Sequence, residues 1–325
     1  MRGVLAVLLL GCGSDPPTPT PTWHSIATGE TSALLAVWGA SSDEVWVVGG
    51  RTSLSGGPTI LRYDGATWTR VDSQQTNLDL WWVFGFADGD VFMTGSGGSI
   101  LRYRDGGFTR LNTPSVAGTI FGLWGSSPTD LWAVGDAGTA GGVVWHSVDG
   151  QNFEPVTIPG TAPRTVFKVH GQASNDVWMS CSAGLTLHWD GTQLVREQAS
   201  TTNSLFSMIT TPGLAVTVGG ISGVGELFEN TGNGWASPAL QVPVPWRGTA
   251  AIGSDITIVG ESGVVAQRTT STWTVLKQQL TTLNFHSAWI DEDHGLWAVG
   301  GLFDGGLSDG VLVYYGSGSI AEVSP

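Results

Sequence analysis

One short phrase, which returns seven times, limits the folds open to this chain more than any other feature. Its clearest copy runs from Leu123 to Gly135 and places two apolar stretches on either side of the turn Ser-Ser-Pro-Thr-Asp. Such turn residues preset the backbone dihedrals or hydrogen-bond to neighbouring backbone, so the phrase predicts a β-hairpin. The second apolar stretches of the copies end at Gly49, Gly95, Gly135, Cys181, Gly219, Gly260 and Gly300.

The spacing of these copies predicts the architecture. Successive ends lie 46, 40, 46, 38, 41 and 40 residues apart, within the period of four-stranded propeller blades. Each unit also holds a third β-rich run, then an Asp-Gly hairpin signal such as Asp64-Gly65, then a fourth run opened by an aromatic residue such as Trp68. No stretch carries a sustained helical period. We therefore expect an all-β chain that forms a seven-bladed β-propeller of four-stranded antiparallel blades.

The N-terminal part of the repeat region indicates how the ring closes. Trp23 to Ile26 resembles the fourth strand of a unit, yet it precedes the first unit. We expect it to pair with the C-terminal blade, so that N- and C-terminal strands share one sheet and no edge stays exposed. The tail from Ser319 to Val323 is the alternative closing strand.

The first residues resemble the signal of a bacterial lipoprotein. Arg2 precedes an apolar run from Val4 to Leu10, which is too short to span a bilayer, and Gly11-Cys12 follows. We divide the chain into a signal peptide (1–11), a lipidated Cys12 with a Pro/Thr-rich tether (12–22) and the propeller (23–325). Gly13 after the Cys implies the outer membrane under the sorting rule of such lipoproteins. An ordinary secretory signal, or a cysteine that occurs here by chance, is the alternative.

Charge and motif content exclude several function classes. The net charge of −14 arises from 27 acidic and 13 basic residues without a basic run, which excludes a nucleic-acid partner. The sequence has no nucleophile elbow, phosphate loop or metal-binding histidine spacing. Its acidic residues gather in the turns between first and second strands, where they suit turn formation better than paired-carboxylate catalysis. We expect no enzyme activity, no cofactor and no metal; the membrane is reached through the lipid anchor alone.

A family resemblance supports this interpretation. The pattern Trp-Gly-Ser-Ser-x-x-Asp-Leu-Trp-Ala-Val-Gly at 124–135, together with Tyr-Asp-Gly-x-x-Trp at 63–68, resembles the repeats of bacterial propeller lipoproteins related to the Ycf48-like, Asp-box (BNR) group. The resemblance implies a scaffold or assembly-factor role without catalysis. Sialidases share the repeat style, but the Phe-Arg-Ile-Pro phrase is absent and Arg62 and Arg102 fall on outer strands.

The candidate binding face comes from one column of the repeat. The residue that lies three positions before the end of the first strand is small in most copies. Trp82 and Lys168 are the two exceptions. They and four residues expected at the same mouth form the candidate face: Trp82, Arg164, Lys168, Trp246, Arg247 and His286. Tolerated variation is the alternative interpretation of these positions.

These observations favour one function over two alternatives. We expect a surface-tethered scaffold that binds a protein partner in the cell envelope through the face carrying the long loops. A glycan-binding propeller is the first alternative, because repeated Trp and low charge suit stacking on sugars. A sialidase-like glycosidase is the second.

Overall fold

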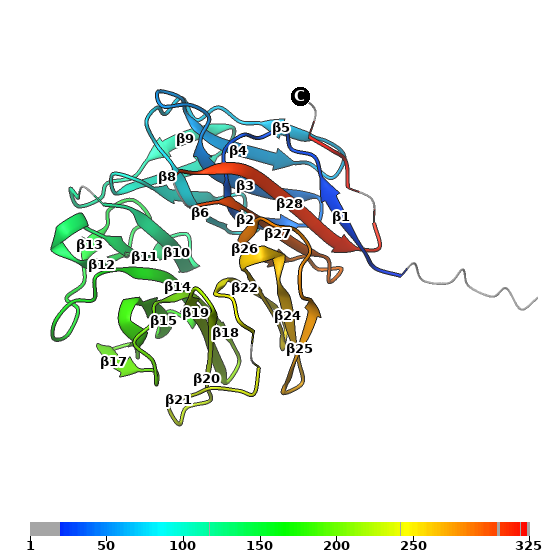
Figure 1. Cartoon of the computed structure of the whole chain (residues 1–325). Coiled ribbons are helices and arrows are strands. Elements are labelled where there is room, and N and C mark those ends of the chain that lie inside the picture. The colour runs from blue at the N-terminus through cyan, green and yellow to red at the C-terminus, as the bar shows by residue number, and fades with distance from the viewer. Residues whose placement is uncertain (1–19, 117, 241, 304–305, 319, 324–325) are drawn as a thin grey trace, which may run out of the picture.

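Seven four-stranded antiparallel sheets make up the computed structural model, which describes residues 20–116, 118–240, 242–303, 306–318 and 320–323. The innermost strands β2, β6, β10, β14, β18, β22 and β26 surround the middle of the ring (Figure 1). This confirms the predicted seven-bladed propeller. The stretch predicted as a signal peptide, the predicted lipidation site Cys12 and most of the predicted tether lie outside the described residues. No helix in the described ranges is long and apolar enough to cross a membrane.

The blades follow one another along the chain, each from inner to outer strand. Blades one to three are β2 (Leu34–Ser41), β3 (Glu44–Arg51), β4 (Pro58–Tyr63), β5 (Trp68–Arg70); β6 (Leu80–Gly85), β7 (Val91–Gly95), β8 (Ser99–Arg104), β9 (Gly107–Arg110); β10 (Ile120–Ser127), β11 (Asp130–Asp136), β12 (Gly142–Ser147), β13 (Glu154–Pro155). Blades four to six are β14 (Val166–Ala173), β15 (Asp176–Cys181), β16 (Leu185–Trp189), β17 (Leu194–Gln198); β18 (Leu205–Thr211), β19 (Leu214–Ile221), β20 (Val224–Asn230), β21 (Trp235–Ala236); β22 (Trp246–Ile252), β23 (Asp255–Gly260), β24 (Val265–Thr269), β25 (Thr272–Lys277). Blade seven is β26 (Asn284–Ile290), β27 (Leu296–Leu302), β28 (Ser308–Gly316) and β1 (Thr22–Ile26). Three short 3-10 turns, η1 (Gly138–Ala140), η2 (Ser182–Gly184) and η3 (Glu261–Gly263), join second to third strands.

The ring closes through the N-terminal strand, as the sequence predicts. β1 pairs antiparallel with β28, with Trp23 opposite Tyr315 and Ile26 opposite Leu312; the blue and red strands lie side by side in Figure 1. The tail is not the closing strand, although the Val323 N–H donates to the Ala27 carbonyl at 3.0 Å. One sheet therefore ties both ends of the propeller together.

The Trp-Gly pair of the repeated phrase holds neighbouring blades together. A Cβ placed on Gly39 of blade one would lie 2.5 Å from the Trp289 ring of blade seven, and one on Gly85 would lie 2.6 Å from the Trp38 ring of blade one. Glycine is thus required where an aromatic ring of the preceding blade comes close to the backbone of the strand. The large rings bury apolar surface between blades, which stabilises sheets that cannot bury their faces alone.

The turn acids have a second role that the sequence did not predict. Glu44 accepts hydrogen bonds at 3.1 Å from Arg62 on the neighbouring strand, and the Arg62 guanidinium lies 5.3 Å from the ring centroid of Trp46. The arrangement recurs with histidine as the base in Asp130–Trp132–His146 and Asp176–Trp178–His188. These carboxylates therefore serve blade packing and are not directed into a shared cleft.

Candidate functional site

A bulge at the start of every first strand builds the candidate site. In blade one, Leu34 and Ala36 lie opposite Gly49 and Val48, which leaves Leu35 as an extra residue. A bulge turns a side chain away from the regular pleat. The same shift occurs in all seven first strands and selects Leu35, Trp81, Phe121, Phe167, Phe206, Arg247 and His286.

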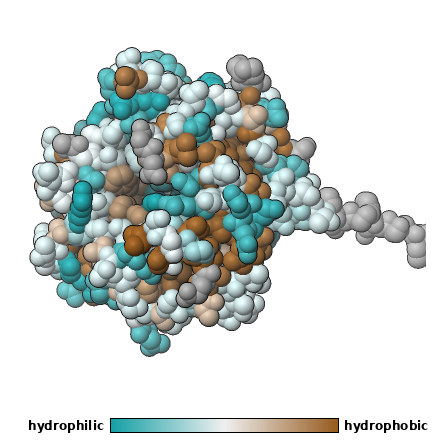
Figure 2. All heavy atoms as spheres, in the orientation of Figure 1, coloured by the Kyte–Doolittle hydropathy of each residue, from teal (hydrophilic) through white to brown (hydrophobic). Residues whose placement is uncertain are grey.

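The bulge residues all lie at one end of the ring. Leu34 is paired with the last part of β3, so the first strand begins where the loops between second and third strands and the links between blades are found. We call this end the long-loop face. It carries four of the six large apolar side chains that are markedly exposed among the described residues: Leu54, Ile221, Val224 and Leu302. In the space-filling view, hydrophobic residues gather near the middle of the molecule while its periphery is mainly white and teal (Figure 2).

Six of the seven bulge residues form a ring of side chains around the axis. Trp81 meets Phe121 edge to face with 5.2 Å between ring centroids, and Phe167 meets Phe206 in the same way at 5.2 Å. The guanidinium of Arg247 lies 4.2 Å from the Phe206 centroid. These contacts hold the aromatic rings in place without filling the centre.

The ring of side chains encloses a cavity of about 210 Å³, which we call the mouth pocket. His286 completes its wall, with its ring centroid 5.7 Å from that of Trp81 and its Nδ1–H donated to the Leu35 carbonyl. The residues that line the pocket are Trp81, Phe121, Phe167, Lys168, Phe206, Arg247 and His286.

Lys168 forms the floor of the mouth pocket. Its Nζ donates to the Phe121 carbonyl at 2.7 Å and lies 3.9 Å from the centroid of the Trp82 ring. The Trp82 indole N–H in turn donates to the Leu123 carbonyl at 2.9 Å. Lys168 reaches Trp82 across blade three because Gly122 has no side chain; a Cβ there would lie 3.2 Å from the Lys168 Cα. The two residues singled out in the sequence column thus touch each other.

The pocket is basic and lacks a matching acid at its floor. Lys168 is 4% exposed, and burial lowers the pKa of its ammonium to about 7. Burial, assisted by the charges of Lys168 and Arg247, lowers the pKa of His286 to about 3, so this imidazole is neutral at physiological pH. Arg247 is paired with Glu261, whose carboxylate accepts from its Nε at 3.2 Å. Among the residues the structure describes, no carboxylate forms an ion pair with Lys168.

The six candidates taken from the sequence divide into three groups. Lys168, Arg247 and His286 line the mouth pocket, and Trp82 supports it from below. Trp246 is fully buried between blades, with no hydrogen-bond partner for its indole N–H in the described part of the chain. Arg164 is exposed in the link before β14 and does not line the pocket.

Sequence reasoning missed the four aromatic wall residues. Trp81, Phe121, Phe167 and Phe206 come one position before the column of small residues. A regular alternation would place them between blades, because neighbouring strand residues point to opposite faces. The bulges change that direction. A signal was present, since the position is aromatic in four of seven copies, but its meaning depended on an irregularity that alternation cannot predict.

Two other cavities have features less suited to ligand binding. A second cavity of about 210 Å³ lies further along the channel and is mainly apolar. It includes His170, whose pKa burial lowers to about 4 and whose Nδ1 accepts from the Thr210 N–H. No group of three or more His, Cys, Asp or Glu within the described ranges is arranged to hold a metal ion.

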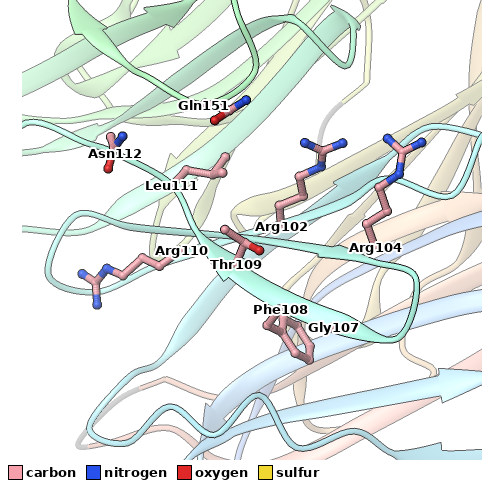
Figure 3. Close-up of a pocket in the computed structure, with 9 residues that line it drawn as sticks. All are labelled: Arg102, Arg104, Gly107, Phe108, Thr109, Arg110, Leu111, Asn112 and Gln151. Carbon is pink, nitrogen blue, oxygen red and sulfur yellow. The ribbon is translucent and has the colours of Figure 1, made fainter.

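A larger cavity, of about 530 Å³, lies on the outside of blade two beside β8 and β9. It holds three arginines, but Arg102 and Arg104 both bind Asp90, at 2.9 and 2.8 Å from its Oδ2. Arg110 extends away from this pair (Figure 3). The three arginines of this cavity therefore do not form one binding site together, unlike the groups that line the mouth pocket.

The described residues define a seven-bladed β-propeller whose long-loop face carries an aromatic and basic mouth pocket. Sequence searches found no matching family model and no matching curated protein. A streptogramin B lyase structure has a TM-score of 0.74 at 14% identity, over 90% of this chain and 97% of that one. YCF48 from Cyanidioschyzon merolae has a TM-score of 0.67 at 16% identity, over 90% and 98%. A structure titled YCF48 bound to D1 peptide has 0.66 at 13%, over 96% and 99%.

These similarities establish a shared fold. Identities of this size do not transfer a function, and propellers support both enzymes and binding proteins. The similar structures include streptogramin B lyase and a YCF48 with a bound D1 peptide, so the choice between catalysis and binding rests on the site itself.

Proposed function

We propose that this chain is a non-catalytic propeller, tethered to the cell envelope, that binds a protein partner through its long-loop face. The observation that carries the proposal is the set of bulges, which brings four aromatic rings and two basic side chains together at one mouth. The exposed apolar side chains of Ile221, Val224 and Leu302 lie on the same face. Aromatic residues and Arg are enriched in protein interfaces, and exposed apolar groups mark them.

Binding of glycans is supported less well by the arrangement. A lectin that uses every blade needs the same polar and aromatic groups in each blade. Here Trp46, Trp132 and Trp297 are fully buried within the propeller. The half-buried rings that line the mouth pocket form one asymmetric site. Catalysis is supported less well too, because Asp130 and Asp176 are engaged with histidines at the blade edges. The peptide-bound YCF48 structure is a precedent for peptide binding by this fold.

The envelope location is a further part of the proposal and rests on the sequence. The apolar run from Val4 to Leu10 followed by Cys12 supports export and lipidation, and the Pro/Thr-rich tether supports a spacer between membrane and propeller. The expected location is the outer membrane. A Cys12→Ala variant should move from the membrane fraction to the soluble extracytoplasmic fraction, whereas unchanged membrane association would contradict a lipid anchor.

The binding proposal is tested by capture from membranes of the source cells with the tagged full chain. An Ile221→Asp/Val224→Asp variant changes two exposed side chains of the long-loop face, and Val148→Asp changes one on the opposite face, where it is 77% exposed. We expect a partner that is retained by Val148→Asp and depleted at least fivefold by the double variant. Equal capture by both variants contradicts the proposed face. Binding to simple sugars on a glycan array, without capture of any protein, favours the lectin alternative.

A further inference from the structure

The mouth pocket contains a charge without a counter-charge, which the proposed function leaves unexplained. The Lys168 ammonium has three N–H donors, yet in the described part of the chain it has one hydrogen bond, to the Phe121 carbonyl, and one aromatic face, Trp82. Burial of an ion without a partner is costly. The other polar groups that line the pocket are the neutral His286 and Arg247, and Arg247 is already paired with Glu261. Neither supplies a carboxylate for Lys168.

The groups around the pocket favour a ligand with a negative charge. Aromatic rings alone attract cations, but Lys168 already lies over Trp82 and Arg247 over Phe206. A further cation would therefore be repelled by the positive charges of Lys168 and Arg247 in a poorly solvated space. An anion would complete the hydrogen bonding of Lys168, and charge-assisted hydrogen bonds of this kind are the strong ones.

The walls and the volume of the pocket indicate the size and polarity of the remaining part of the ligand. Trp81, Phe121, Phe167 and Phe206 provide apolar surface on most sides. About 210 Å³ is below the roughly 300–1,000 Å³ of sites that bury drug-sized ligands. The space therefore suits a group about as large as one amino-acid side chain. A strongly hydrated anion such as inorganic phosphate gains nothing from aromatic walls, whereas a carboxylate on an apolar body uses both features.

We propose that the mouth pocket binds a carboxylate carried on an aromatic or other apolar group, with Lys168 as the residue that pairs with the carboxylate and the four aromatic rings as the wall around the apolar part. This deepens the proposed function and rests on it where the carboxylate belongs to a protein partner. A free small acid presents the same chemistry, and the two sources are separated by experiment.

The test measures binding of matched acids and amides to the full chain by isothermal titration calorimetry. Phenylacetate and indole-3-acetate are compared with phenylacetamide and indole-3-acetamide, which keep the shape and lose the charge. For a polypeptide source, the capped peptide Gly-Phe-Glu-Gly is compared with Gly-Phe-Gln-Gly. We expect each acid to bind at least tenfold more tightly than its amide. Equal affinity of acid and amide, or no binding by any probe, overturns the proposal.

Two lysine variants make the test specific. Lys168→Met keeps the length and apolar character of the side chain and removes its charge; we expect it to weaken acid binding at least tenfold. Lys277→Met, on the outer strand β25, is the matched control and should bind as the wild type does. Retained acid binding by a folded Lys168→Met protein, with folding checked by circular dichroism, overturns the proposal.

The pH dependence adds a readout that a purely structural lysine would not give. Because the ligand pairs with the protonated amine, and the pKa of Lys168 is about 7, affinity should be about tenfold lower at pH 8 than at pH 6. The other facing groups do not titrate in this range: His286 is already neutral and Arg247 stays charged. A pH-independent affinity contradicts pairing with Lys168.

The outcomes separate this proposal from the proposed function. Capture of a partner that depends on Ile221 and Val224, without binding of any acid, overturns the carboxylate proposal and leaves the protein-binding function standing. Acid binding that depends on Lys168, without a captured protein, supports a small-molecule source and contradicts the scaffold function. Competition between a bound acid and the captured partner supports both.

Discussion

A glycine-to-alanine substitution at the joint between the first and last blades tests the packing rule that holds the ring together. A Cβ on Gly39 would lie 2.5 Å from Cη2 of Trp289 and 2.9 Å from the Glu44 carbonyl oxygen. Carbon atoms in contact are about 3.5–4.0 Å apart, so the indole must move by about 1 Å. Overpacking of this kind costs about 1–3 kcal/mol. The lower entropy of the unfolded alanine chain returns about 0.4–1 kcal/mol, which leaves a net loss of about 1.3 kcal/mol when the middle of each range is taken.

Urea unfolding followed by tryptophan fluorescence measures this loss. Gly107→Ala on the edge strand β9 is the control, because a Cβ there would meet nothing closer than 3.8 Å and Gly107 does not have a positive φ; it should change stability by less than about 0.5 kcal/mol. Trp289→Leu removes the ring and leaves the Glu44 carbonyl oxygen in place, so Gly39→Ala should cost less in that background than in the wild type but still cost something, as expected for coupled sites. Equal stability of Gly39→Ala and wild type, or full additivity in the double variant, refutes the inter-blade Trp-Gly contact.

Three further predictions concern charge. At pH 7 the Lys168→Met variant should melt at the same temperature as the wild type or at a higher one. Burial lowers the pKa of Lys168 in the folded protein, so this lysine destabilises the fold at every pH below its pKa in the unfolded chain. A clearly lower melting temperature in differential scanning calorimetry contradicts this. Burial lowers the pKa values of His170 and His286 to about 4 and 3. Their contribution to stability is therefore complete above about pH 6.5 and declines as the pH falls toward these values. Between pH 7 and pH 4.5 the melting temperature of a His170→Gln/His286→Gln variant should fall less than that of the wild type, and equal falls argue against neutral buried imidazoles. Asp90→Asn removes the negative charge and one of the two acceptor oxygens that Arg102 and Arg104 share. It should cost about 1–3 kcal/mol, a value that urea unfolding measures against Asp105→Asn, whose side chain is 94% exposed.

The fold was predictable because repetition made one weak signal into a strong one. A single copy such as Ile256 to Gly260 indicates no more than a short apolar strand. Seven copies at nearly constant spacing specify the number of blades. The additional strand from Trp23 to Ile26, which precedes the first copy, specifies where the ring closes. Local periodicity and closure of sheet edges are properties that hold without knowledge of side-chain packing.

The site was predictable in part, for a physical reason. Lys168 and Trp82 departed from a column of small residues, and the structure places them in contact. Their neighbours Phe121 and Phe206 could not be assigned, because their direction depends on bulges whose positions the alternating pattern does not reveal. Trp246 was misplaced for the related reason that it precedes the bulge residue Arg247 and so points between blades, where it is fully buried.

The bulges explain why one end of the ring carries binding groups while the blades stay regular. An extra residue at the start of a first strand adds a side chain to the mouth without changing the pairing that holds the blade, as the register on either side of Phe167 shows. These seven positions can therefore vary in sequence with little cost to the Trp-Gly contacts deeper in the ring. Leu35 and Phe121 occur at the same position as Arg247 and His286, which is the asymmetry that a specific ligand requires. A buried lysine beside these residues weakens the fold at neutral pH and gives no ion pair in return among the described residues; that cost is understandable if a bound carboxylate supplies the missing partner.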